Sequence, residues 1–122
     1  VLNITNVRYL RTLAKATNRH YLLYRLQDKD TNRDGKINNE DITSLYISKL
    51  DGTEFAKLTP DLHQLDEYVM KDWCSRCYFR TMEDVNKDGK FTKKDKYHYF
   101  YIDFSSDPYK IVEYNPLDLV LK

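Results

Sequence analysis

Neither sign of charge is in excess in this chain of 122 residues, which carries 20 basic and 19 acidic side chains. No basic stripe indicates a nucleic-acid partner, and no acidic tail indicates a solvated arm. Long apolar runs are also absent, so no segment is expected to span a membrane. Glycine and proline are scarce, with three residues each, whereas 11 tyrosines and 5 phenylalanines are present. Because aromatic side chains favour half-buried pleated surfaces, this composition favours strands.

The length of the chain predicts a single domain over residues 1–122, long enough to bury a core of its own. The chain begins with VLNITNVRYL, which is neither a signal peptide nor a start at methionine. We therefore expect either a leader that has been removed or a start inside a longer chain.

An acidic phrase centred on glycine occurs twice in the chain. DTNRDGKINNED occupies residues 30–41, and DVNKDGKFTKKD occupies residues 84–95. An offset of 54 residues superposes the two phrases, and the segments around them match in character. YLLYRLQD precedes the first phrase and RCYFRTME precedes the second. The sequence thus predicts two copies of one supersecondary unit, over about residues 19–60 and 65–116.

The segments outside the two phrases favour strands. YHYFYIDF at residues 97–104 is an aromatic and β-branched run without a polar face, which suits a strand covered on both faces. Asp51-Gly52 is a good hairpin dipeptide. Each unit is predicted to run strand, acidic loop, strand, turn, strand, and LDEYVMKD from residue 65 adds a fourth strand to the second unit. The expected fold is mainly β, with two antiparallel meanders.

A short helix is predicted near the N-terminus. Apolar side chains fall there on one helical face, namely Val7, Leu10, Leu13 and Ala14. Thr5 or Asn6 can cap the start of this helix, and Asn18 can end it.

Side chains that carry oxygen recur at alternate positions of both phrases. The first loop offers Asp30, Asn32, Asp34, the Lys36 carbonyl, Asn38 and Asp41. The second loop offers Asp84, Asn86, Asp88, the Lys90 carbonyl, Thr92 and Asp95. A hard cation such as calcium takes about 6–8 oxygens near 2.4 Å, and without a cation such convergent oxygens repel one another. An ordinary surface turn rich in Asp and Asn is the alternative, but two copies in register favour two calcium sites.

Both phrases resemble the EF-hand calcium loop, with Asp instead of Glu at position 12, and in this they are similar to the loops of dockerins. The segment SLYISKLDGTEFAKLTP after the first phrase looks like the end of a TolB-type β-propeller blade, and KDWCSRCYFRTMED is similar to the preceding strand pair. These resemblances imply calcium loops inserted in blade-like meanders. An α-helical EF-hand pair, acting as a sensor or as a dockerin-like docking module, is the alternative fold and function.

Cys74 and Cys77 form a single CxxC motif. If Ser75-Arg76 were a two-residue hairpin turn, the two cysteines would face each other and could form a disulfide. Two reduced thiols, or metal or redox chemistry, are the alternatives.

No nucleophile stands near a base at a recognisable spacing, so a non-catalytic protein is expected. The leading hypothesis is a calcium-binding β module that is exported to the periplasm, the cell surface or the medium, for example as an outer-membrane lipoprotein. Extracellular calcium modules work at about 10⁻⁴–10⁻³ M, a concentration that the cytosol does not supply. The expected partner is another protein of a cell-envelope assembly.

Overall fold

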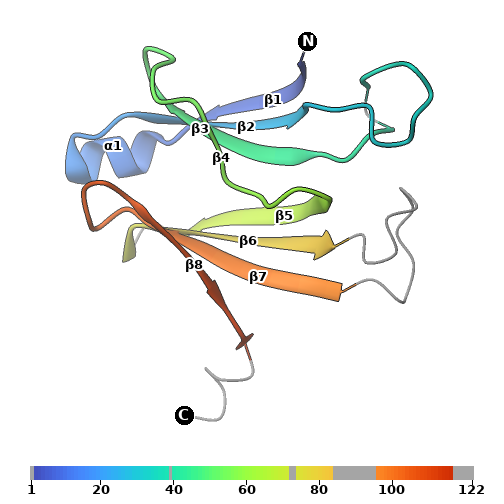
Figure 1. Cartoon of the computed structure of the whole chain (residues 1–122). Coiled ribbons are helices and arrows are strands. Elements are labelled where there is room, and N and C mark those ends of the chain that lie inside the picture. The colour runs from blue at the N-terminus through green and yellow to red at the C-terminus, as the bar shows by residue number, and fades with distance from the viewer. Residues whose placement is uncertain (1, 39, 72–73, 84–95, 117–122) are drawn as a thin grey trace.

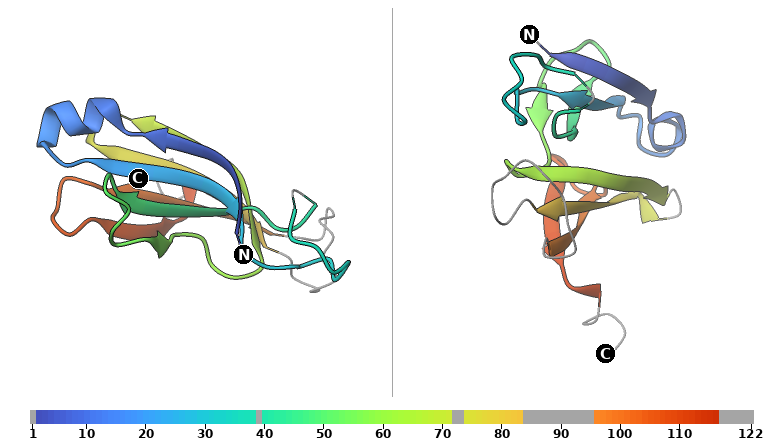
Figure 2. Two further views of the ribbon diagram at one scale, coloured as in Figure 1. Left: turned by 90° about the horizontal axis from the view of Figure 1, so that it is seen from above. Right: turned by 90° about the vertical axis from the view of Figure 1, so that its right-hand side faces the viewer.

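Two four-stranded antiparallel sheets and one short helix make up the described part of this computed structural model, which covers residues 2–38, 40–71, 74–83 and 96–116. The first sheet holds its strands in chain order: β1 (Asn3–Tyr9), β2 (Tyr21–Gln27), β3 (Ser44–Lys49) and β4 (Ala56–Lys57). The second sheet has the same order: β5 (His63–Lys71), β6 (Arg76–Glu83), β7 (Lys96–Asp103) and β8 (Lys110–Tyr114). The sheets lie face to face (Figure 1), one over the other when seen from above (Figure 2). The prediction of a mainly β fold is confirmed.

A common core fills the space between the sheets. Leu23 and Ile47 reach it from β2 and β3, and Phe79 and Ile102 reach it from β6 and β7. Phe79 stacks on Phe100 with ring centroids 4.9 Å apart. Burial of each such side chain stabilises the fold by roughly 1.5–3 kcal/mol. The sheets are therefore held together chiefly by apolar contacts.

Strand β7 is covered on one face only, which corrects the expectation of a strand covered on both. Phe100 and Ile102 are buried between the sheets, whereas Tyr97 on the other face is 49% exposed. Tyr101 and Tyr99 also lie on this outer face, beside Tyr114 of β8. A tyrosine ring can pack against neighbouring rings while its hydroxyl stays in water, so a run of tyrosines does not require burial.

The predicted short N-terminal helix is present, but it begins later than expected. The first part of the N-terminal segment forms β1, which pairs with β2 along its length, and only Arg11–Thr17 is helical (α1). The helix ends where the sequence predicts, because Asn18 takes a left-handed φ of 58° and its N–H bonds to the Ala14 carbonyl at 2.8 Å. Val7 therefore belongs to a strand, and the backbone pairing with β2 outweighs its helical spacing.

Strands, not helices, flank the first acidic loop, so the alternative fold, an α-helical EF-hand pair, is wrong. The loop joins β2 to β3 at one end of the molecule, and α1 lies at the other end (Figure 1). The second acidic phrase falls between β6 and β7, and residues 84–95 lie outside the described residues. Among the described residues, no helix is long and apolar enough to cross a membrane.

Candidate metal centre

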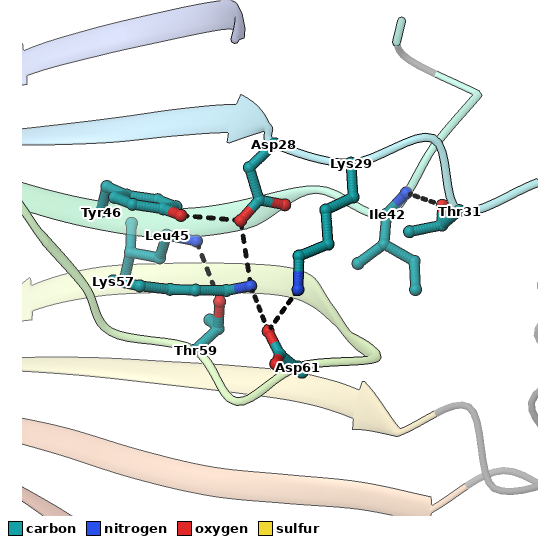
Figure 3. Close-up of polar contacts among 9 residues, drawn as sticks. All are labelled: Asp28, Lys29, Thr31, Ile42, Leu45, Tyr46, Lys57, Thr59 and Asp61. Atoms are coloured by element: carbon teal, nitrogen blue, oxygen red, sulfur yellow. Dashed lines mark hydrogen bonds and ion pairs between the residues drawn. The ribbon is translucent and has the colours of Figure 1, made fainter. Parts of the chain in front are cut away.

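A polar cluster anchors the base of the loop that joins β2 to β3 (Figure 3). The Asp28 carboxylate accepts hydrogen bonds from the Tyr46 hydroxyl at 2.7 Å and from the Lys57 ammonium at 3.0 Å. Lys57 also contacts the Asp61 carboxylate at 2.7 Å. Burial opposes the charge of Asp28, but the bonds from Tyr46 and Lys57 outweigh it and lower the pKa of this carboxyl. Asp28 thus stays ionised and ties the start of the loop to β3 and β4.

Hydrogen bonds across the loop close it above this base. The backbone N–H of Ile42 donates to the Thr31 hydroxyl at 2.8 Å (Figure 3). The Asp41 carboxylate accepts from the backbone N–H of Asn32 at 3.2 Å and from that of Asn38 at 2.9 Å. Both ends of the acidic phrase are therefore joined by direct contacts.

Three carboxylates converge inside the closed loop. One oxygen each of Asp30, Asp34 and Asp41 lies within 4.8 Å of the others. Gly35 makes the sharp turn with a φ of +86°, an angle that favours glycine, and its N–H donates to the Asp30 carboxylate at 2.7 Å. The N–H of Lys36 donates to Asp34 at 2.9 Å. Backbone N–H groups thus orient the carboxylates, and a cation held between them would offset their mutual repulsion.

Asp41 is the most deeply buried of these three carboxylates, with 3% of its surface exposed. Burial alone would raise the pKa of its carboxyl, but the hydrogen bonds from Asn38, Asn32 and Thr31 outweigh burial and lower that pKa. The position-12 residue is therefore a buried and ionised carboxylate, which is the form that binds a cation.

Asn32 and Asn38, two further expected ligands of the first loop, differ in their position relative to the three carboxylates. The side-chain oxygen of Asn32 accepts the N–H of Asp34 at 3.3 Å, so it belongs to the same turn as the three carboxylates. The side-chain oxygen of Asn38 accepts the N–H of Glu40 at 3.0 Å. Asn32 is thus beside the carboxylate group, whereas Asn38 caps the turn that leads to Asp41.

The second expected set of ligands lies outside the described residues. This set comprises Asp84, Asn86, Asp88, Lys90, Thr92 and Asp95. Its sequence identity to the first loop at positions 1, 3, 5, 6, 7 and 12 remains the basis of that prediction.

The donor set of the first loop fits a hard divalent cation. Its side chains offer carboxylate and amide oxygens, and no histidine or cysteine belongs to this cluster in the described residues. Oxygen ligands suit calcium and magnesium, whereas zinc prefers nitrogen and sulfur. The number of protein oxygens distinguishes the two ions, because calcium takes about 6–8 oxygens whereas magnesium usually keeps several waters.

The cysteines are placed differently from the expected hairpin. Lys71 pairs with Arg76 and Met70 pairs with Cys77, so Ser75-Arg76 is not a two-residue turn that sets the cysteines opposite each other. Both cysteines are free thiols in the structure. Cys77 is fully buried, and burial raises the pKa of its thiol to about 12.

A second cluster of potential metal ligands lies on the other sheet, and the spacing of its residues along the chain did not indicate it. His63, Glu83 and His98 each place one ligand atom within 4.8 Å of the others. Burial and the neighbouring His98 lower the pKa of His63. For His98, burial opposes the charge, but hydrogen bonds to Glu113 and Glu83 outweigh it and raise the pKa. The register of the second sheet brings these residues together.

No family model, characterised protein or solved structure matches the chain. The function of the candidate metal centre is therefore inferred from its own geometry and chemistry.

Proposed function

We propose that the protein is a non-catalytic calcium-binding β module, in which calcium stabilises the connections between strands. The observation that carries this proposal is the convergence of Asp30, Asp34 and Asp41 within 4.8 Å, in a loop already closed by backbone hydrogen bonds. The ligands of the first site would be these carboxylates, with Asn32, the Lys36 carbonyl and Asn38 completing the set.

A calcium ion at this place would stabilise the sheet as well as the loop. The loop runs directly from β2 into β3, and its base is bonded to β3 and β4 through Asp28. Neutralising the repulsion between the carboxylates would remove a cost of folding that the calcium-free protein bears. The expected gain in the free energy of unfolding follows mass action and rises with the calcium concentration.

The second acidic phrase is proposed to form a second, weaker calcium site. Residues 30–41 carry a formal net charge of −2, whereas residues 84–95 carry +1 because they include four lysines. Positive charge near a divalent cation opposes its binding. The two phrases occupy the same place in the two strand orders, between the second and third strands, which supports the proposed repeat.

From the calcium concentration that such sites need, we infer that the protein is exported. Sites of ordinary affinity fill at about 10⁻⁴–10⁻³ M calcium outside the cell, and cytosolic calcium is too scarce for them. We therefore place the protein in the periplasm, on the cell surface or in the medium, with a scaffolding or interaction role in a cell-envelope assembly. The partner would be recovered with the protein from envelopes kept in calcium and lost when a chelator is added.

Calorimetric titration with calcium tests the proposal directly. Asp34→Asn and Asp88→Asn are matched variants, because each removes the charge at position 5 of one loop. The wild type should bind two ions, Asp34→Asn should weaken the tighter site by about tenfold or more, and Asp88→Asn should weaken the other. A wild-type protein that binds no calcium, or that binds magnesium equally well, would contradict the proposal.

A further inference from the structure

His63, Glu83 and His98 come from three neighbouring strands of the second sheet. His63 at the start of β5 lies directly opposite Glu83 at the end of β6. His98 of β7 lies opposite Thr81, which is two residues before Glu83 and so on the same face of β6. The two imidazole rings have centroids 4.8 Å apart. Three strands in register thus set two imidazoles and a carboxylate close together, on backbone that is paired into a sheet.

A neighbouring group orients each of the two histidines. The Nδ1 of His98 is hydrogen bonded to the Glu113 carboxylate of β8 at 2.8 Å, and its Nε2 is turned toward Glu83 at 2.7 Å. The Nδ1 of His63 is hydrogen bonded to the buried Thr81 hydroxyl at 2.8 Å. A carboxylate on the far nitrogen of an imidazole fixes the ring and makes its other nitrogen a better metal ligand.

The cluster is buried on one side and open on the other. Phe100 packs beneath both histidines, with ring centroids 6.4 Å from each. His63 is 8% exposed, whereas the side chains of His98 and Glu83 are 23% and 36% exposed. An ion can therefore reach the cluster from the side of His98 and Glu83.

We propose that His63, Glu83 and His98 bind a divalent first-row transition metal, with zinc the best fit. Two imidazoles and one carboxylate form a ligand set that zinc accepts, with water in the fourth position. Glu113 is a positioning residue, which acts on the metal through His98. This site differs from the calcium loop in its donor atoms, since it offers nitrogen, and it does not depend on the calcium proposal.

Binding requires a small rearrangement of the cluster. Zinc bonds its nitrogen and oxygen ligands at about 2.0–2.2 Å. The hydrogen bond between His98 and Glu83 must give way to the metal, while the bond between His98 and Glu113 persists. The rearrangement is confined to side chains at the ends of paired strands.

Cobalt(II) titration in excess calcium tests this site. Calcium competes with cobalt for the oxygen-lined loops, and the visible absorption of bound cobalt reports the type of its ligands. The variants are Glu83→Gln and His98→Gln, with Glu113→Gln for the positioning role. His20→Ala is the matched control, because His20 is the third histidine of the chain and is bonded to Tyr9, outside the cluster.

The wild type and His20→Ala should bind one cobalt ion, with visible bands typical of nitrogen ligands, and zinc should displace it. Glu83→Gln and His98→Gln should abolish the bands, and Glu113→Gln should weaken zinc binding by about tenfold or more. Equal binding by wild type and His98→Gln would overturn the proposal.

A measurement on the wild-type protein alone tests the proposal even if the variants do not fold. In the imidazole NMR spectrum, zinc should shift the resonances of His63 and His98 and leave those of His20 in place. Shifts at His20 alone, or no shift at all, would overturn the proposal.

Discussion

The carboxylate of Asp41 accepts a hydrogen bond of 3.2 Å from the backbone N–H of Asn32, nine residues earlier in the same loop. Its other oxygen accepts the N–H of Asn38 at 2.9 Å. The last residue of the acidic phrase therefore joins the two ends of the loop through backbone hydrogen bonds. Asp41 thus closes the loop, and this role can be separated by experiment from its proposed role in binding calcium.

Replacing Asp41 should destabilise the protein even in a chelator. Asp41→Asn removes the charge and one of the two acceptor oxygens from a buried position. Hydrogen bonds to a charged group are worth about 1.5–3 kcal/mol, so we expect a loss of about 2 kcal/mol in the free energy of unfolding. Urea denaturation in EGTA measures this loss, and calcium should restore less stability to the variant than to the wild type.

Glu40→Gln is the control for that experiment, because it makes the same change of charge at the neighbouring, exposed position. Its free energy of unfolding in EGTA should stay within about 0.5 kcal/mol of the wild type. Equal effects of the two variants would show that net charge, and not the contacts of Asp41, sets the stability of the loop.

Two glycines with the same backbone angle allow a matched test of the turn. Gly35 in the acidic loop and Gly52 in the β3–β4 hairpin both have a φ of +86°, and an added Cβ would meet no atom within 4 Å at either place. Alanine at either position should cost about 1–2 kcal/mol from backbone strain. Only Gly35→Ala should also weaken calcium binding in a titration, and an equal loss of affinity in Gly52→Ala would argue against a local effect.

The contribution of Asp28 to stability should depend on pH. Its folded pKa lies below the ordinary value of 3.8, so its contribution is present above that value and is lost as the pH falls through the folded pKa. Asp28→Asn should therefore be less stable than the wild type at pH 7, by about 2 kcal/mol. Urea denaturation from pH 7 to pH 3 should show this difference shrinking on acidification. A difference that stays constant or grows would contradict the ionised contact with Lys57.

The two thiols should differ strongly in reactivity. Cys77 is fully buried with a pKa of about 12, whereas Cys74 is partly exposed. A thiol reagent should therefore label one cysteine of the native protein quickly and the second only after unfolding. The labelling should be the same before and after treatment with a reductant. Two cysteines that react with the reagent only after reduction would instead indicate a disulfide.

The strand pattern could be predicted where one face of a strand is buried. In β7 the aromatic and β-branched run indicated a strand, although Phe100 and Ile102 are buried on one face only and not on both faces as expected. Strand β1 could not be recognised in this way, because Ile4 and Val7 are about half exposed and the strand has no apolar face. Pairing with β2, which local sequence does not encode, determines its conformation.

The two candidate metal sites also differ in whether the local sequence indicates them. Asp30, Asp34 and Asp41 lie within one short loop, so their spacing alone indicated that they converge. His63 and His98 are brought together by strand register, and the distance between them along the chain carries no signal. A site built across strands becomes visible only when the pairing of those strands is known.

A structure determined in millimolar calcium is the most direct test of the account. It should show an ion bonded to oxygens of Asp30, Asp34 and Asp41 at about 2.3–2.6 Å, with the loop still closed between Thr31 and Ile42. If the three carboxylates instead pointed into solvent with no ion between them, the proposed calcium module would be wrong.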